Sequence, residues 1–159
     1  AISQSESDYQ STGPAETITD TTQFFIEQAK LWHKSSALIG GLKQSVEFEY
    51  FHFLQPNQYY ENSKELSEEE LQTAYEYGPF SYKTAVQIGY PYLIYNGQYL
   101  VDQGINYFDL TLMFKNEKRT VYSDKCCHFN ELGYDLIAEK ISQSVLYQFD
   151  KNKIPSRNP

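Results

Sequence analysis

The chain has 159 residues, 40% hydrophobic and 16% aromatic, which is enough apolar content for one domain with a core but not for two. Its 21 acidic and 13 basic residues give a formal net charge of −8, and the basic residues form no stripe that could neutralise phosphates. We therefore expect no binding to nucleic acid or to an anionic membrane surface. No apolar run approaches the roughly 20 residues of a transmembrane helix, so no membrane span is predicted.

The first segment, residues 1–20, is polar and begins at Ala1 without an initiator methionine. A processed product or a fragment of a longer protein has this appearance, and we expect the segment to be flexible. A helix is predicted next, because apolar residues recur at helical spacing from Asp20 to Gly41, with an acid or threonine available as the N-cap.

Residues 46–54 are dense in aromatic and β-branched side chains and end at a Gln-Pro-Asn loop. This composition predicts an internal strand. A second helix is predicted to start at Ser67, because Ser67 and Glu70 have the spacing of a capping box.

Another helix is predicted through residues 77–86, ending before Gly89, and the dipeptide Asn96-Gly97 predicts a turn. Residues 105–110 are expected to form a short strand. The last helix is predicted to begin after Asn130, its N-cap, and to leave a frayed tail over residues 150–159.

This order of helices and strands is typical of an α/β layer structure with a parallel sheet. Two strands alone would leave open sheet edges and exposed apolar faces. The pattern therefore predicts that residues 21–149 form part of a larger domain.

The main chemical signal is an acid and a histidine, Asp124 and His128, directly before the last helix. A carboxylate near a histidine can hold the imidazole in one tautomer and aim it at a nucleophile. The neighbouring Cys126 and Cys127 are too strained to bridge each other easily, and no two further ligands stand at a spacing typical of a metal site. No metal and no cofactor is predicted.

Three stretches resemble the C-terminal half of SGNH (GDSL-type) hydrolases. Residues 51–70, with Phe-His-Phe-Leu-Gln-Pro-Asn-Gln-Tyr at their start, are similar to a segment of bacterial members, and residues 32–38 are similar to the helix before it. Residues 124–138 are similar to the family's last block, where an acid and a histidine complete a Ser-His-Asp triad.

The resemblance implies a flavodoxin-like three-layer α/β/α domain that hydrolyses carboxylic esters, as an esterase, lipase or carbohydrate acetylesterase. His128 would take the serine proton and Asp124 would orient His128. The family usually places the acid three residues before the histidine, whereas Asp124 is four before, a difference that a one-residue bulge would absorb. No Gly-Asp-Ser block and no Gly-x-Asn-Asp block occurs in the chain.

We therefore expect the chain alone to be inactive, with the serine on the N-terminal half of the domain, supplied by an upstream segment or a partner chain. The substrate would be a small ester or an acylated glycan, and a secreted or cell-envelope location is suspected. Gln55 and Asn57 follow the strand's carboxyl end, where α/β sheets bind ligands, so they are candidate substrate-binding residues, although turn formation around Pro56 also explains them.

The alternative function is a non-catalytic α/β binding module for a glycan or protein partner. In that reading His128 and Asp124 would only cap or pack, and the tyrosine-rich middle would hold the partner. Packing between helices and sheet is a further explanation of the tyrosines. His52 alternates onto one face of an apolar strand, and a buried, hydrogen-bonded histidine is expected there.

Overall fold

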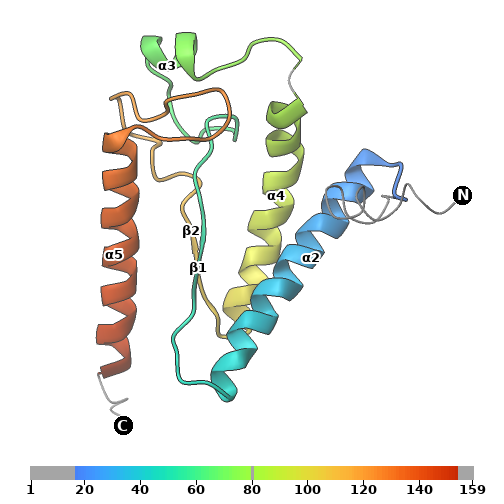
Figure 1. Ribbon diagram of the computed structural model, residues 1–159, viewed down its shortest axis with the longest axis vertical. Coiled ribbons are helices and arrows are strands. Elements are labelled where there is room, and N and C mark those ends of the chain that lie inside the picture. Colours follow the sequence, from blue (N-terminus) through green and yellow to red (C-terminus); the bar gives the residue numbers. More distant parts are fainter. Residues whose placement is uncertain (1–16, 80, 154–159) are drawn as a thin grey trace, which may run out of the picture.

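A computed structural model describes residues 17–79 and 81–153 of the chain as a mixed α/β structure (Figure 1). Its two strands pair in parallel, with α5 on one side of the pair and α2 and α4 on the other (Figure 1). The elements in chain order are α2 (Thr21–Gly41), the 3₁₀ turn η1 (Leu42–Gln44), β1 (Phe51–Leu54), α3 (Glu68–Thr73), α4 (Ser81–Asp102), β2 (Asn106–Asp109) and α5 (Glu131–Lys153).

One face of the strand pair is built from phenylalanine rings. Phe53 pairs in register with Phe108, and their stacked rings lie 5.0 Å apart. Phe51, on the same face, contacts Phe149 of α5 with ring centroids 5.9 Å apart. Because side chains alternate along a strand, these rings point toward α5 and the neighbouring residues point toward α2 and α4.

The opposite face carries a histidine in a hydrogen-bonded aromatic setting. His52 packs against Trp32 of α2, with ring centroids 4.5 Å apart, and its Nδ1 lies 2.6 Å from Ser36 Oγ and 3.1 Å from the Tyr50 hydroxyl. Burial lowers the pKa of His52. The expectation of a hydrogen-bonded histidine at this position is confirmed, although the side chain is partly rather than fully buried.

The first strand is shorter than the sequence indicates. A strand was predicted over residues 46–54, but β1 begins at Phe51, which pairs with Asn106, the first residue of β2. The chain before β2 turns at Gly104, whose φ of +77° favours glycine. Residues 46–50 therefore have no paired strand among the described residues, and propensity alone does not make a ladder.

The prediction of a helix end before Gly89 and a turn at Asn96-Gly97 is wrong, because α4 runs through both sites. Asn96 Nδ2 donates to the carbonyl of Tyr92 inside the helix, at 2.8 Å. At Gly97 a Cβ would lie 2.2 Å from the Tyr107 ring. The glycine thus serves the close approach of helix and strand rather than a turn.

The predicted helix starts at Ser67 and Asn130 are confirmed. Ser67 Oγ accepts from the Glu70 N–H at 3.2 Å while the Glu70 carboxylate accepts from the Ser67 N–H at 2.7 Å, which is a complete capping box. Asn130 Oδ1 accepts from the Gly133 N–H at 2.9 Å. The helix that follows extends to Lys153, so the start of the expected tail is helical. Residues 1–16 and 154–159 of the expected flexible ends lie outside the described residues.

Candidate functional site

The Asp124 and His128 side chains lie on a short loop closed by backbone hydrogen bonds. Tyr122 and Phe129 form an antiparallel bridge, and the Ser123 N–H donates to the His128 carbonyl at 3.0 Å. The first turn of α5 presses on this bridge at Gly133, where a Cβ would lie 2.7 Å from the Val121 carbonyl oxygen. The Tyr122–Phe129 bridge therefore joins the two ends of the loop, and α5 packs against this bridge.

Asp124 uses its two carboxylate oxygens for different purposes. Oδ1 accepts from the backbone N–H groups of Cys126, Cys127 and His128, at 2.9, 3.1 and 3.3 Å. Oδ2 lies 2.5 Å from Nδ1 of the His128 ring. The first set of bonds orients the carboxylate, and the oriented carboxylate in turn orients the imidazole.

The arrangement leaves the far nitrogen of His128 available for proton transfer. With Nδ1 donating to Asp124, a neutral ring keeps Nε2 as an acceptor, and no hydrogen bond of Nε2 occurs in the described part of the chain. The His128 side chain is 63% exposed and that of Asp124 is 44% exposed. Partial burial raises the pKa of Asp124, but the His128 bond and the backbone N–H donors outweigh it, so the net pKa is lowered and the carboxylate stays charged.

The four-residue spacing is accommodated by the loop itself. Lys125 occupies the additional position and turns outward, where its Nζ lies 2.8 Å from the Glu76 carboxylate. The Asp124 carboxylate and the His128 ring meet despite the extra residue.

Two side chains from the loop after β1, Gln58 and Tyr59, bind the backbone of the Asp124–His128 loop. Gln58 Nε2 donates to the Asp124 carbonyl at 2.9 Å and to the Ala74 carbonyl at 3.1 Å. The Tyr59 hydroxyl donates to the Lys125 carbonyl at 2.8 Å. Sequence reasoning missed both residues, because a main-chain acceptor 66 positions away leaves no local pattern.

The two predicted substrate-binding residues lie in different surroundings. Asn57 is fully buried, its Nδ2 donates to the Tyr82 hydroxyl at 2.7 Å, and its Oδ1 accepts from the Tyr59 N–H at 3.0 Å. Gln55 is exposed, one residue beyond the end of β1. Burial raises the pKa of Tyr90, next to both side chains, to about 12. Asn57 therefore has a structural role, whereas Gln55 remains accessible to a ligand.

A buried carboxylate, that of Glu70, connects α3 to the backbone of Val121 and Tyr122, just before the Asp124–His128 loop. Glu70 accepts from the Val121 and Tyr122 N–H groups at 2.9 and 3.1 Å, and its other oxygen lies 2.7 Å from Lys64 Nζ. Both charged side chains are 0% exposed. Burial raises the pKa of Glu70, but Lys64 and the backbone donors lower it by more. The sequence indicated only the capping role of Glu70.

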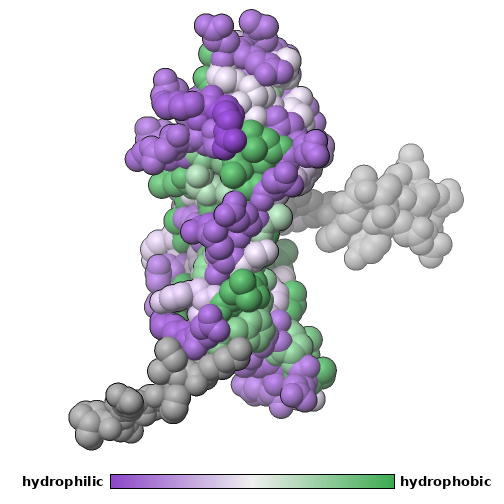
Figure 2. Space-filling view, turned by 90° about the vertical axis from the view of Figure 1, so that its left-hand side faces the viewer, coloured by the Kyte–Doolittle hydropathy of each residue, from purple (hydrophilic) through white to green (hydrophobic). Residues whose placement is uncertain are grey.

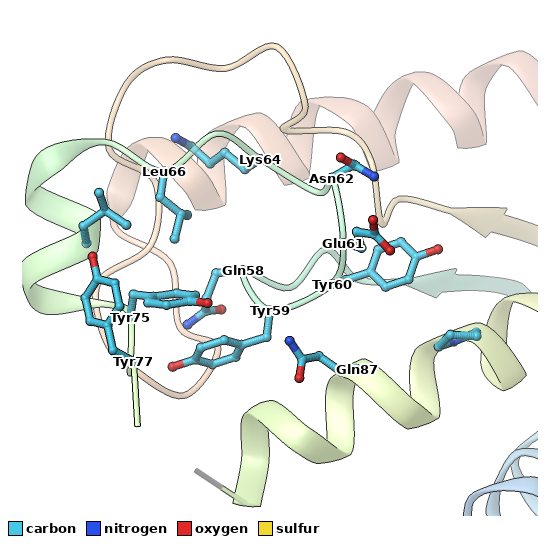
Figure 3. A pocket seen from close by; sticks show the side chains of 12 residues that line it. Gln58, Tyr59, Tyr60, Glu61, Asn62, Lys64, Leu66, Tyr75, Tyr77 and Gln87 are labelled. Carbon is cyan, nitrogen blue, oxygen red and sulfur yellow. The ribbon is translucent and has the colours of Figure 1, made fainter. Parts of the chain in front are cut away.

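A cavity of about 760 Å³ lies beside this framework, between the loop after β1, α3 and α4 (Figure 3). Gln58 and Tyr59 line it, so the residues that hold the Asp124–Lys125 backbone are also part of its wall. Tyr75 and Tyr77 stand close to Tyr59 at one end of the cavity (Figure 3). The cavity has the size of a small-molecule site.

Within residues 17–79 and 81–153, no cluster of histidine, cysteine and acidic side chains has the geometry of a metal site, and no helix has both the length and the apolar character needed to cross a membrane. The chain matches no known family model, no curated protein and no solved structure.

Proposed function

We propose that this chain is the C-terminal part of a serine ester hydrolase of the SGNH type, in which His128 is the general base and Asp124 orients it. The observation that carries the proposal is the contact between Asp124 Oδ2 and His128 Nδ1, on a carboxylate already held by backbone donors. A triad needs this second half: an imidazole with a fixed tautomer, an accessible Nε2 and a charged orienting acid.

In the proposed reaction, a serine hydroxyl adds to the ester carbonyl while His128 Nε2 takes the serine proton. Collapse of the tetrahedral intermediate breaks the ester bond, and the imidazolium returns the proton to the leaving alcohol. Water then hydrolyses the acyl-enzyme by the same proton transfers in reverse order. Asp124 stays ionised throughout and stabilises the imidazolium, and the reaction requires no metal or organic cofactor.

The serine and the oxyanion donors belong, in this proposal, to the N-terminal half of the domain, on an upstream segment or a partner chain. The complete domain would be a flavodoxin-like three-layer α/β/α structure. The sheet supports this view, because among residues 17–79 and 81–153 it has two parallel strands and both of its edges are open. Large apolar side chains on α2 and α5 also stay exposed, including Leu38 and Leu146 at 73% and 64%.

Gln55 remains the proposed substrate contact, because it is exposed just past the carboxyl end of β1. Asn57 is proposed to position neighbouring side chains rather than to touch the substrate. It bonds to Tyr82, and the Tyr82 hydroxyl in turn interacts with the Cys127 side chain next to His128.

The test is hydrolysis of p-nitrophenyl acetate by the complete gene product, compared with the His128→Ala and Asp124→Asn variants. Loss of the base is expected to lower kcat by about 10²–10⁴-fold, with the Asp124→Asn effect in the same direction. A fluorophosphonate should label a serine outside this chain. The matched control is Asp135→Asn, an exposed acid on the first turns of α5, which should keep full activity.

An inactive complete protein, or full activity in His128→Ala, would overturn the esterase proposal. Because the His128 side chain is mostly exposed, the variant is expected to fold, and circular dichroism of both variants checks this. Glycan binding that survives His128→Ala without any ester turnover would favour the binding module instead.

A further inference from the structure

The cavity beside the Asp124–His128 loop combines aromatic faces with hydrogen-bonding side chains. Its lining includes tyrosines on two segments: Tyr59 and Tyr60 after β1, and Tyr75 and Tyr77 after α3. Gln87 extends from α4 toward the Tyr59 ring (Figure 3). Aromatic faces bind the apolar faces of sugar rings, while amides and carboxylates bind their hydroxyl groups.

The most accessible aromatic surface belongs to Tyr77. Its side chain is 69% exposed and its ring stands at 74° to that of Tyr75, with centroids 5.0 Å apart. Lys83 Nζ lies 4.7 Å from the centre of the Tyr75 ring. Tyr75 is thus supported on its own side of the cavity, and the exposed Tyr77 ring is left as a platform for a ligand.

Several polar groups of the cavity wall have unused hydrogen-bonding capacity. Gln58 Oε1 is buried and has no hydrogen-bond partner in the described structure, although the Nε2 of the same amide makes two bonds. The side chains of Glu61, Asn62 and Gln87 are exposed at the rim and make no hydrogen bond within the described residues. Such groups are matched by a ligand that carries many hydroxyls.

The charges of the wall select against an anionic ligand. Lys64 is the one cation among the 12 lining residues, and its ammonium is committed to Glu70. Glu61 adds a carboxylate at the rim, and the whole chain has a net charge of −8. A neutral ligand is therefore favoured over a uronic acid, a phosphate or a fatty acid.

From these features we propose that the cavity is a binding subsite for a neutral oligosaccharide, with Tyr77 as the stacking platform and Gln87 as a hydroxyl ligand. Gln58 and Tyr59 line the subsite and also hold the backbone of the Asp124–His128 loop, so a bound glycan would contact two side chains that position this loop. If the esterase function holds, on which this step rests, the substrate class is an acylated neutral polysaccharide.

The test is calorimetric titration of the chain with neutral glucan, xylan and chitin oligosaccharides, with oligogalacturonate as the anionic comparison. At least one neutral ligand should bind, and Tyr77→Ala should weaken that binding about tenfold, the loss of one stacking contact. Gln87→Ala should weaken it less. The matched control is Tyr95→Ala. Tyr95 is an exposed tyrosine like Tyr77, but it lies on α4 and outside the cavity, so this variant should bind as the wild type does.

Absence of binding to every neutral oligosaccharide would overturn the proposal, as would equal losses in Tyr77→Ala and Tyr95→Ala, or preference for oligogalacturonate. Saturation-transfer NMR on the same samples should show transfer from the protein to the sugar protons in the wild type and in Tyr95→Ala, and weaker transfer in Tyr77→Ala. The readout is binding, so it is independent of the esterase test: sugar binding without ester turnover leaves the subsite standing, and ester turnover without sugar binding removes it.

Discussion

The two ends of the molecule differ in how completely their large apolar side chains are buried. At the end that carries α3 and the Asp124–His128 loop, buried residues form a closed core, and even charged groups are paired (Figure 1). At the other end, where α2 and α5 finish, large apolar side chains stay exposed. These are Leu38, Ile39, Leu42, Val46, Leu146 and Phe149.

Figure 2, viewed from the α5 side, shows green apolar patches between polar side chains in both the upper and the lower half of this face. Exposed apolar side chains gathered at one end are typical of a surface that packs against further structure. They support the proposal that this chain is part of a larger domain.

The largest expected effect breaks the closed end. Glu70→Ala would leave Lys64 as an unpaired buried charge and remove the acceptor for the Val121 and Tyr122 N–H groups. We expect a loss of about 3–5 kcal/mol in the free energy of unfolding, measured by urea denaturation. Glu68→Ala, an exposed acid on the same helix, should change stability by less than about 0.5 kcal/mol. Similar values for the two would show that the site end is not closed.

The second prediction concerns the contact of α4 with β2. Gly97→Ala would place a Cβ 2.2 Å from the Tyr107 ring, so overpacking should outweigh the better helix propensity of alanine. We expect destabilisation of about 1–3 kcal/mol in thermal or urea unfolding. Gly41→Ala, at the end of α2, meets nothing within 4 Å and should be neutral or slightly stabilising. Neutral behaviour of Gly97→Ala would contradict the packing described here.

The third prediction uses pH to probe the closed end. The pKa of Glu70 is lower in the folded protein than the ordinary 4.5, so the unfolded state binds the proton first as pH falls. The stabilisation is therefore fully present above about pH 4.5 and is lost as pH falls below that value toward the folded pKa. Urea unfolding between pH 7 and pH 3 should show this decline, and Glu70→Gln should show a shallower one. Equal slopes would mean that Glu70 is not the group responsible.

The smallest expected effect tests the open end. Leu38→Gln replaces a side chain that is 73% exposed, and it should alter the stability of this chain by no more than about 0.5 kcal/mol. In the complete protein the same change should lower the free energy of unfolding by more, because the proposed N-terminal half would cover the Leu38 side chain. Leu110→Ala, at a buried position, is the comparison variant. It should lower the free energy of unfolding by about 2–5 kcal/mol in both the isolated chain and the complete protein. A large effect of Leu38→Gln in the isolated chain would remove the contrast between the ends.

Local sequence signals correctly predicted where helices begin, but they wrongly predicted a helix end and a turn inside α4. A capping box is decided by atoms within three residues, so Ser67 and Asn130 were recognisable from the sequence. Gly89 and Asn96-Gly97 have the same appearance in a turn and in a helix that packs closely against a neighbour. The rings that approach these glycines belong to other elements: Phe25 of α2 at Gly89 and Tyr107 of β2 at Gly97.

The residue types and spacing of Asp124, His128 and Asn130 came from the sequence alone, because a loop before a capped helix is a local arrangement. The tertiary structure decided the rest of the site. Glu70 and Gln58 act on backbone groups more than 50 residues away, and Asn57 is buried under Tyr82. Hydrogen bonds to a distant main chain carry no sequence pattern, since every residue offers the same carbonyl and nearly every one the same N–H.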